Sequence, residues 1–330
     1  MIISPALASW CADKERQEAT VVRLEDVRRR LRTLPPVAEL ERRADLSDGA
    51  DPEPLLRSAR EFLQAGGVGQ CFDLLASAAL EDPFFRPPVR SGLSEIQAGL
   101  LLIDRPLLSI YLSVASAAAI AEKRLSRSGP ASIAFSGRRS IYRFLRAGGA
   151  VLSLWEAPEI EPGFSAGSSG SCRLVEQRPI VDGDLLELDG RRHGFVIESA
   201  RSDIVYLQAS TPAGAAPLMV EYDSQTLLFA GASSSDEVSS RVQLMLSLLR
   251  TMDRRDAAPL FREMLNGPNF FDRWHAMREF LALDSALALP HLREMAALDP
   301  HPEVRAAAGS TLAAFFAEDE AAQKGRSCPD

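Results

Sequence analysis

The sequence predicts an α+β protein in which a β-barrel lies between N-terminal and C-terminal helices. Between Gly148 and Ala209, short apolar runs alternate with Pro, Gly and Asp-Gly turns, which is typical of antiparallel strands. On either side of the strand-rich part, apolar residues recur every three or four positions, the period of a helix. We expect four parts: an N-terminal helical segment (1–90), the barrel (91–235), a C-terminal helical domain (236–318) and a disordered tail (319–330).

The composition and net charge of the chain argue against some classes of function. The chain has 330 residues, 46% of them hydrophobic, which is enough for more than one core. A net charge of −8 argues against a nucleic-acid-binding surface, because neutralising phosphates needs clustered positive charge. Only three of the 37 basic residues are lysines, which we attribute to the codon usage of a GC-rich bacterial genome.

Cysteine usage and hydropathy predict a cytoplasmic protein. The four cysteines are far apart and form no CxxC motif, which fits a reducing compartment. The longest apolar run, 107–121, contains Ser and Tyr and is shorter than the roughly 18–20 residues of a membrane span. The first residues lack the basic leader and long apolar core of a signal peptide. We therefore expect no membrane partner.

Three helices are predicted near the N-terminus. The first covers 20–34 and ends at Pro35-Pro36, and a polar linker follows over 44–54. The other two cover 55–63 and 72–80, with Gly66-Gly67 between them, and should form an antiparallel pair.

Four arginines, at positions 28, 29, 30 and 32, belong to the first of these helices. The apolar stripe of that helix leaves them largely on its water-facing sides. We interpret them as a solvated face and not as an anion site.

Strands begin near residue 95, and the segment 117–124 fits either a helix or a strand. After the strand-rich part, helical spacing returns and continues almost to the end of the chain. The predicted C-terminal helices are 238–252, 256–265, 269–283, 285–298 and 302–317.

The segment DPHPEVRAAAGSTLAAFF (299–316) resembles the second half of a HEAT-type repeat. FDRWHAMREFLAL (271–283) is similar to it, about thirty residues upstream. The resemblance implies an inward stripe of Val304, Ala308, Leu312 and Phe315, and a surface for packing or for a partner protein. Two units are fewer than the roughly three that a stable repeat array needs. A bundle that only supports the barrel therefore remains an alternative.

The segment from Gly183-Asp184 to His193, GDLLELDGRRH, resembles the second motif of the cupin superfamily. That resemblance implies a jelly-roll type barrel, with His193 in the place of a histidine that ligates a metal. Upstream, PGFSAG (162–167) stands where the first cupin motif would lie. Its form is similar to the thiol dioxygenase branch of the superfamily.

The departures from the cupin pattern determine what we expect of the chemistry. Phe164 and Ala166 stand where the resemblance implies two histidines, and Ser171 stands near the glutamate position. Iron and similar ions need about three N/O protein ligands, and only His193 is left. We therefore expect no metal and no cofactor.

Five residues of the barrel are the candidate ligand-binding site: His193, Trp155, Glu156, Arg143 and Cys172. His193 could contact a ligand; a polar residue at the barrel mouth or a satisfied core histidine is the alternative. The Trp-Glu pair follows a strand and could line a cavity, although a tryptophan in a strand is more often part of the core. Arg143 is a candidate anion ligand or a surface residue. An arginine follows Cys172 and could lower the pKa of its thiol; a buried, inert thiol is the alternative. No catalytic residue is assigned.

Two functions remain open. The first is a non-catalytic binding, scaffold or regulatory protein, with a small-molecule ligand in the barrel or a protein partner on the C-terminal helices, and with a homodimer as a further expectation. The alternative is a cupin-type enzyme, dioxygenase-like or isomerase-like, with an atypical site around His193. We favour the first, because the metal-ligand positions of the resemblance carry other residues.

Overall fold

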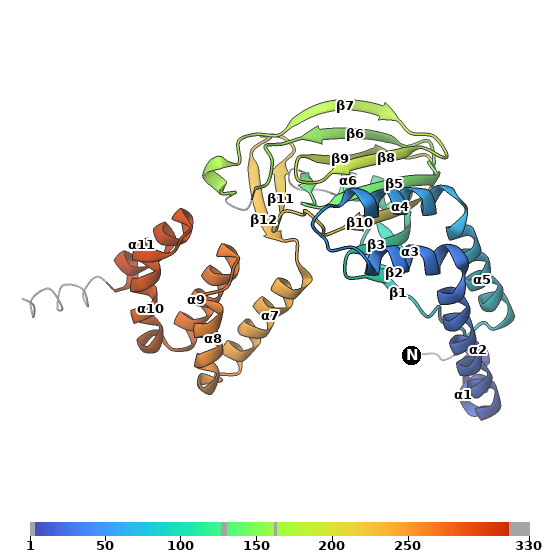
Figure 1. The fold of residues 1–330 in the computed structure, drawn as a ribbon, viewed down its shortest axis with the longest axis horizontal. Helices are drawn as coiled ribbons and strands as arrows, with labels where there is room; N and C mark the ends of the chain where they lie inside the picture. Colours follow the sequence, from blue (N-terminus) through green and yellow to red (C-terminus); the bar gives the residue numbers. More distant parts are fainter. Residues whose placement is uncertain (1–3, 127–130, 162–163, 317–330) are drawn as a thin grey trace, which may run out of the picture. The chain divides into compact units, whose positions relative to one another are not determined.

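The computed structural model describes residues 4–126, 131–161 and 164–316, which divide into two compact units (Figure 1). One unit comprises residues 1–160 and 169–232, and the other comprises 161–168 and 233–330. The predicted tail, 319–330, lies outside the described residues. The predicted division into the parts 1–90, 91–235 and 236–318 stays a prediction.

The N-terminal helices are more extensive than predicted. Proline is well suited to the first turn of a helix, so Pro35 and Pro36 begin a helix directly after ending the previous one. This helix occupies the start of the expected polar linker. The sequence reasoning also missed the first helix, whose N-cap Ser4 accepts a hydrogen bond from the Leu7 N–H. The helices are α1 (Pro5–Ala12), α2 (Lys14–Thr33), α3 (Pro35–Asp45), α4 (Glu53–Gln64) and α5 (Gly67–Glu81).

The largest sheet has six antiparallel strands in the order β1-β2-β3-β10-β5-β8. Helices α3, α4 and α5 share one hydrophobic cluster with its outer face, where Ile110, Ile141 and Leu207 meet Leu55 and Leu63. Figure 1 shows α3 and α4 lying along this sheet. The strands are β1 (Arg90–Leu93), β2 (Gln97–Arg105), β3 (Leu108–Ala115), β5 (Arg139–Arg146), β8 (Leu185–Asp189) and β10 (Ile204–Thr211).

Two smaller sheets complete this unit. One has the order β7-β6-β9 and the other β12-β11-β4, and β4 lies beside β9. A second hydrophobic cluster fills the space between the sheets, where Leu152 and Ile197 meet Tyr142 and Phe144. The strands are β4 (Ser132–Phe135), β6 (Val151–Glu156), β7 (Arg173–Pro179), β9 (His193–Ser199), β11 (Leu218–Asp223) and β12 (Phe229–Ser234).

The strand order is that of a jelly roll. Strands β3-β10-β5-β8 pack against β4, β9, β6 and β7, so each layer alternates early and late strands of the chain. Jelly rolls have this double-sheet arrangement, and the α+β fold class is confirmed. The expected barrel is not closed, because ladders join the described strands into three separate sheets.

The ambiguous segment 117–124 is a helix, α6 (Ala117–Leu125). Ser116 is its N-cap and accepts a hydrogen bond from the Ala119 N–H, which favours the helix over a strand. None of the helices in the described part of the chain is long and apolar enough to cross a membrane. The cytoplasmic location stays a prediction.

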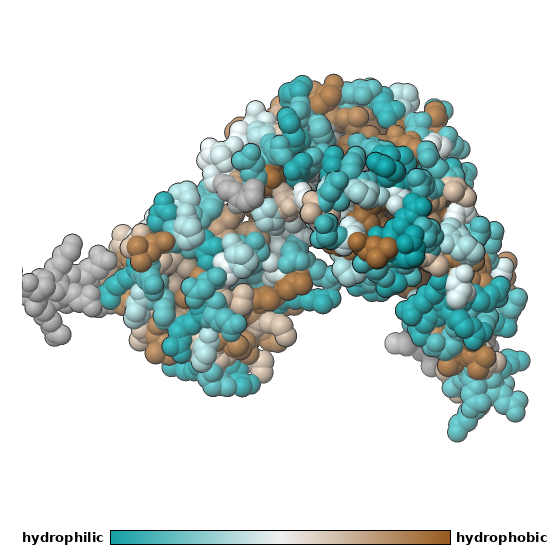
Figure 2. All heavy atoms as spheres, viewed as in Figure 1, coloured by the Kyte–Doolittle hydropathy of each residue, from teal (hydrophilic) through white to brown (hydrophobic). Residues whose placement is uncertain are grey.

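The C-terminal unit is a helical array whose five predicted helices are confirmed, with ends that shift by at most two residues. Phe261 and Phe280 stack at its centre, with ring centroids 5.6 Å apart. Figure 2 shows apolar residues reaching the surface in scattered patches. The helices are α7 (Glu237–Thr251), α8 (Ala258–Met264), α9 (Phe270–Leu283), α10 (Ser285–Leu298) and α11 (Pro302–Phe315).

The inward stripe of the last helix is only partly as predicted. Val304, Ala308 and Leu312 are buried, but Phe315 is 78% exposed. The helix ends at Phe315, and the ring of Phe316 packs on the hydrophobic cluster in its place.

Candidate functional site

Two of the five candidate residues are brought together at one end of strands β6 and β9. Glu156 and His193 are cross-strand partners, and their Oε1 and Nε2 atoms lie 4.0 Å apart. Arg173 and Arg192 also form ion pairs with Glu156. The Glu156 carboxylate is therefore already compensated by two guanidinium groups.

Trp155 lies on the opposite face of the sheet from this pair. It stands opposite Gly194, and successive residues of a strand alternate between faces. Its indole Nε1 is buried and has no hydrogen-bond partner among the described residues. Leu152 and Leu154 of the same strand face the cluster between the sheets, so Trp155 lies on the other face of β6 and does not join Glu156 and His193.

Arg143 and Cys172 lie apart from the pair. Arg143 alternates with Tyr142 along β5 and donates a hydrogen bond to the Leu63 carbonyl of α4, on the helix-covered side of the sheet. Cys172 is buried, and burial raises the pKa of its thiol. This is the reverse of the lowered pKa that its arginine neighbour suggested, and it matches the inert-thiol alternative.

Sequence reasoning missed a polar cluster on the inner face of the largest sheet. The Oγ atoms of Ser140 and Ser210 lie 2.8 Å apart, and the Gln208 amide donates to Ser210 at 3.1 Å. Burial raises the pKa of the neighbouring Tyr206 phenol to about 12, and it raises that of Tyr142 as well. These phenols are protonated at neutral pH, so the cluster offers hydrogen bonds to a neutral polar group and no base.

A signal for half of this cluster is visible in the sequence. Tyr206, Gln208 and Ser210 alternate along one strand, which puts them on one face. Ser140 is seventy residues upstream of Ser210, and only the pairing of β10 with β5 brings the two together.

Residues 162 and 163 of the expected first cupin motif lie outside the described residues, and its described part, 164–167, does not belong to a strand. Phe164 is a buried residue of a connecting segment, and Ala166 begins a single turn of 3₁₀-helix, Ala166–Ser168. Ser171 forms an isolated bridge with Leu228. The described residues contain no group of three or more His, Cys, Asp and Glu side chains that could hold a metal ion.

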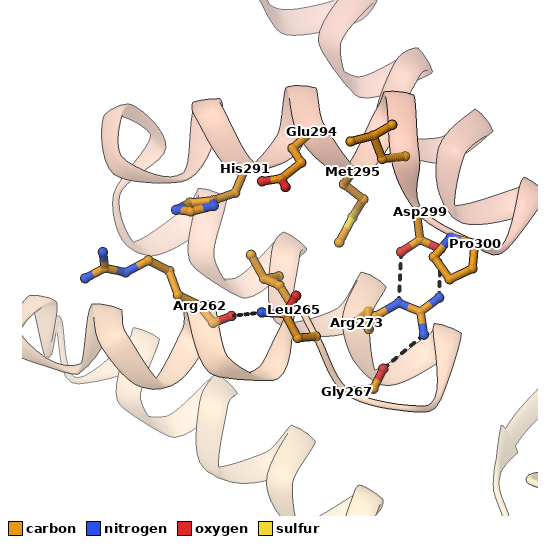
Figure 3. A pocket seen from close by; sticks show the side chains of 11 residues that line it. Arg262, Leu265, Gly267, Arg273, His291, Glu294, Met295, Asp299 and Pro300 are labelled. Carbon is orange, nitrogen blue, oxygen red and sulfur yellow. Dashed lines mark hydrogen bonds and ion pairs between the residues drawn. The ribbon is translucent and has the colours of Figure 1, made fainter.

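The C-terminal unit contains a pocket of about 420 Å³ between the end of α8 and the C-terminal half of α10 (Figure 3). Arg273 and Asp299 lie at one end of it and form a two-bond pair, with N–O distances of 2.7 and 2.8 Å. The guanidinium of Arg273 also donates to the carbonyls of Gly267 and Pro268. This end of the pocket is therefore rigid and fully paired.

The electrostatics of the buried pair follow from its burial. Burial opposes ionisation of Asp299, but the hydrogen bonds from Arg273 and from the His301 N–H outweigh it and lower the pKa of the carboxyl group. The two side chains are 7% and 4% exposed, so the pair is desolvated and the charges cancel.

The rest of the lining combines an apolar wall with a charged rim. Met295, Leu265 and Leu298 supply apolar surface. Figure 3 shows Glu294 and His291 on α10, across from Arg262 on α8. Arg262 and Glu294 carry opposite charges, so the pocket suits a group with an apolar body and polar ends. Peptide segments have this chemistry.

Comparison with known proteins finds no matching family model and no match among curated proteins. Among solved structures, the chain is similar to ectoine synthase from P. lautus (14% identity, 37% of this chain and 68% of that one, TM-score 0.23). It is also similar to a cupin-superfamily sugar phosphate isomerase from Silicibacter pomeroyi (12% identity, 45% of this chain and 90% of that one, TM-score 0.24). A third similar structure is an RmlC-like cupin with a double-stranded β-helix fold from Methanocaldococcus jannaschii (9% identity, 38% of this chain and 91% of that one, TM-score 0.23). At these TM-scores the likeness carries no argument about this chain, whose jelly-roll assignment rests on its own strand order.

Proposed function

We propose that the protein is a non-catalytic binding or scaffold protein whose C-terminal helices hold a partner protein in the pocket between α8 and α10. The observation that supports this most is the pocket itself. It has a volume of about 420 Å³, an apolar wall and a rim that carries both signs of charge. Interfaces combine such an apolar centre with a polar rim, and a few anchor residues supply most of the binding energy.

The proposal includes HEAT-like packing of the helices. Small residues where helices α9, α10 and α11 meet support this packing. Ala276, Ala288 and Ala308 each have no exposed surface, and all three belong to one hydrophobic cluster. Alanine lets helix axes approach closely, as stacked helical repeats require.

The test compares two leucines of α10. Leu298 lines the pocket and Leu287 does not, and both are exposed, so glutamate is tolerated at either position. The full-length chain with a photo-crosslinking residue at position 298 would identify the partner in a lysate of the source organism. With that partner purified, we expect Leu298→Glu to weaken its binding by about tenfold or more, because a hot-spot contact is lost. Leu287→Glu should leave the dissociation constant unchanged.

Two results would contradict the proposal. One is a partner that binds both variants as tightly as the unmodified chain. The other is that a photo-crosslinking residue at position 298 captures no protein in higher yield than the same residue at position 287.

A small-molecule ligand between the sheets is a second candidate, supported by the polar cluster of Ser140, Ser210 and Gln208. The enzyme alternative is supported by the Glu156–His193 pair, although Arg173 and Arg192 already hold that carboxylate. A cytoplasmic location and a homodimer remain parts of the proposal.

A further inference from the structure

We propose that the first unit binds a small organic phosphate in a second pocket, bounded by α2, α3 and strands β1 and β2. The pocket has a volume of about 250 Å³. Arg28 and Arg32 of α2 line it, together with Arg90 of β1 and Arg105 of β2. Two of the arginines that the sequence assigned to a solvated face thus meet two others from distant parts of the chain.

The lining has an excess of positive charge. Its four arginines face two carboxylates, those of Glu41 and Asp104, so the lining carries a net charge of 4 − 2 = +2. Asp104 pairs with Arg90 at 2.6 Å, and Glu41 pairs with Arg105 at 2.8 Å. Both carboxylates are therefore engaged by strand arginines. Asp45, outside the lining, also lies 3.9 Å from Arg105, so the two arginines of α2 supply the positive charge that is open to a ligand.

The two arginines of α2 are available to a ligand. Arg32 forms no ion pair with any described residue. Arg28 contacts Glu25 at 2.6 Å, but both side chains are about half exposed, and such pairs one helical turn apart contribute little. A phosphate could replace Glu25 as the partner of Arg28 at small cost.

One lining residue, Arg105, also has an unmet hydrogen-bond donor. The Nε of Arg105 is buried and has no acceptor among the described residues, although its Nη2 is bonded to Glu41. Leaving a buried donor of a charged group unpaired is costly. A ligand oxygen that reached this nitrogen would supply the missing acceptor.

The chemistry of the ligand follows from the shape of the lining. Guanidinium groups from three separate elements surround one space, which suits a tetrahedral dianion whose several oxygens each need donors. Apolar side chains, among them Leu31, Val37 and Leu101, form the rest of the wall and leave room for a small organic body. The volume is below that of typical drug-sized sites. We therefore assign a small phosphomonoester, and not a nucleotide, as the ligand.

The arginine run of α2 provides a matched experiment on the full-length protein. Arg28→Gln/Arg32→Gln removes two lining charges, and Arg29→Gln/Arg30→Gln removes two charges of the same helix that are not in the lining. Phenyl phosphate is the probe, with inorganic phosphate and benzoate in parallel, and calorimetric titration near pH 8 gives each dissociation constant. We expect the first double variant to weaken phenyl phosphate binding about tenfold or more. The second should change it less than about twofold.

Circular dichroism shows whether the variants are folded. If Arg28→Gln/Arg32→Gln does not fold, Arg90→Gln replaces it, because that exposed residue contributes little to the core. The proposal is overturned if phenyl phosphate does not bind saturably, or if both double variants lose affinity equally. Benzoate binding as tightly as phenyl phosphate would overturn the assignment to a phosphate.

Discussion

The carboxylate of Asp299 anchors the C-terminal unit, and its removal by Asp299→Ala should be costly. The side chain accepts two hydrogen bonds from Arg273 and one from the His301 N–H. Arg273 is only 7% exposed, so without Asp299 a charged guanidinium remains buried with two carbonyl oxygens as its acceptors. Breaking a buried pair in this way costs about 3–5 kcal/mol. We expect the free energy of unfolding of this unit to fall by that amount.

An exposed pair of the same geometry serves as the control. Arg254 and Asp256 also form two hydrogen bonds, at 2.7 and 2.8 Å, but Asp256 is 66% exposed. Asp256→Ala should therefore leave stability nearly unchanged. Urea denaturation, followed by hydrogen exchange in peptides from α9, α10 and α11, measures both variants in the same unit.

A double variant separates the pair's net contribution from the cost of breaking it. Arg273→Met/Asp299→Leu replaces both charges with apolar side chains of similar size and should recover most of the lost stability. The reasoning is refuted if Asp299→Ala costs no more than Asp256→Ala. It is also refuted if the double variant is less stable than Asp299→Ala alone, because a buried unpaired charge would then not be the cause.

The same pair predicts how stability depends on pH. The folded-state pKa of Asp299 is lowered from the reference value of 3.8, so the unfolded chain binds the proton more tightly than the folded one. The stabilisation is therefore complete above pH 3.8 and is lost as the pH falls through the folded-state value. The urea midpoint of the unmodified chain should therefore decrease as the pH is lowered below 3.8, and the midpoint of the double variant should decrease less.

Two further predictions concern packing and metal content. Ala308→Asp should destabilise the C-terminal unit by about 3 kcal/mol or more, because it buries an unpaired carboxylate, whereas Ala306→Asp, at an exposed position, should be nearly neutral in a thermal melt. An unchanged melt for both would mean that this face of α11 is not packed. The purified protein should contain less than about a tenth of an equivalent of Fe, Mn, Ni or Zn by elemental analysis. Stoichiometric metal that disappears in His193→Ala would support the enzyme alternative.

The features that follow from local periodicity could be predicted from the sequence. The C-terminal helices were placed within two residues of their ends, because apolar spacing and turn residues mark them directly. Helix α3 was missed because Pro35 and Pro36 were interpreted only as the end of a helix, although proline also begins one. The jelly-roll strand order came from the resemblance of the segment ending at His193, since local patterns do not specify which strands pair.

The binding features depend on pairing and could not be predicted in full. Glu156 and His193 were both candidates, but their contact requires the register of β6 on β9. Arg28 and Arg32 looked like a solvated face because their neighbours in the pocket, Arg90 and Arg105, are from 90 − 32 = 58 to 105 − 28 = 77 residues away in the chain. Local spacing describes one helix face and says nothing about which strand lies opposite.

The position of β10 has a consequence for the order in which the first unit folds during synthesis. This strand lies between β3 and β5, and its residue Tyr206 pairs with Ser113, which is 206 − 113 = 93 residues earlier. Until β10 leaves the ribosome, β3 and β5 each lack a neighbour on one edge. The hydrophobic cluster shared with α3 and α4 then lacks Leu207 and Ala209 of β10, and the open strand edges promote aggregation. A nascent chain paused before residue 204 would therefore depend on chaperones.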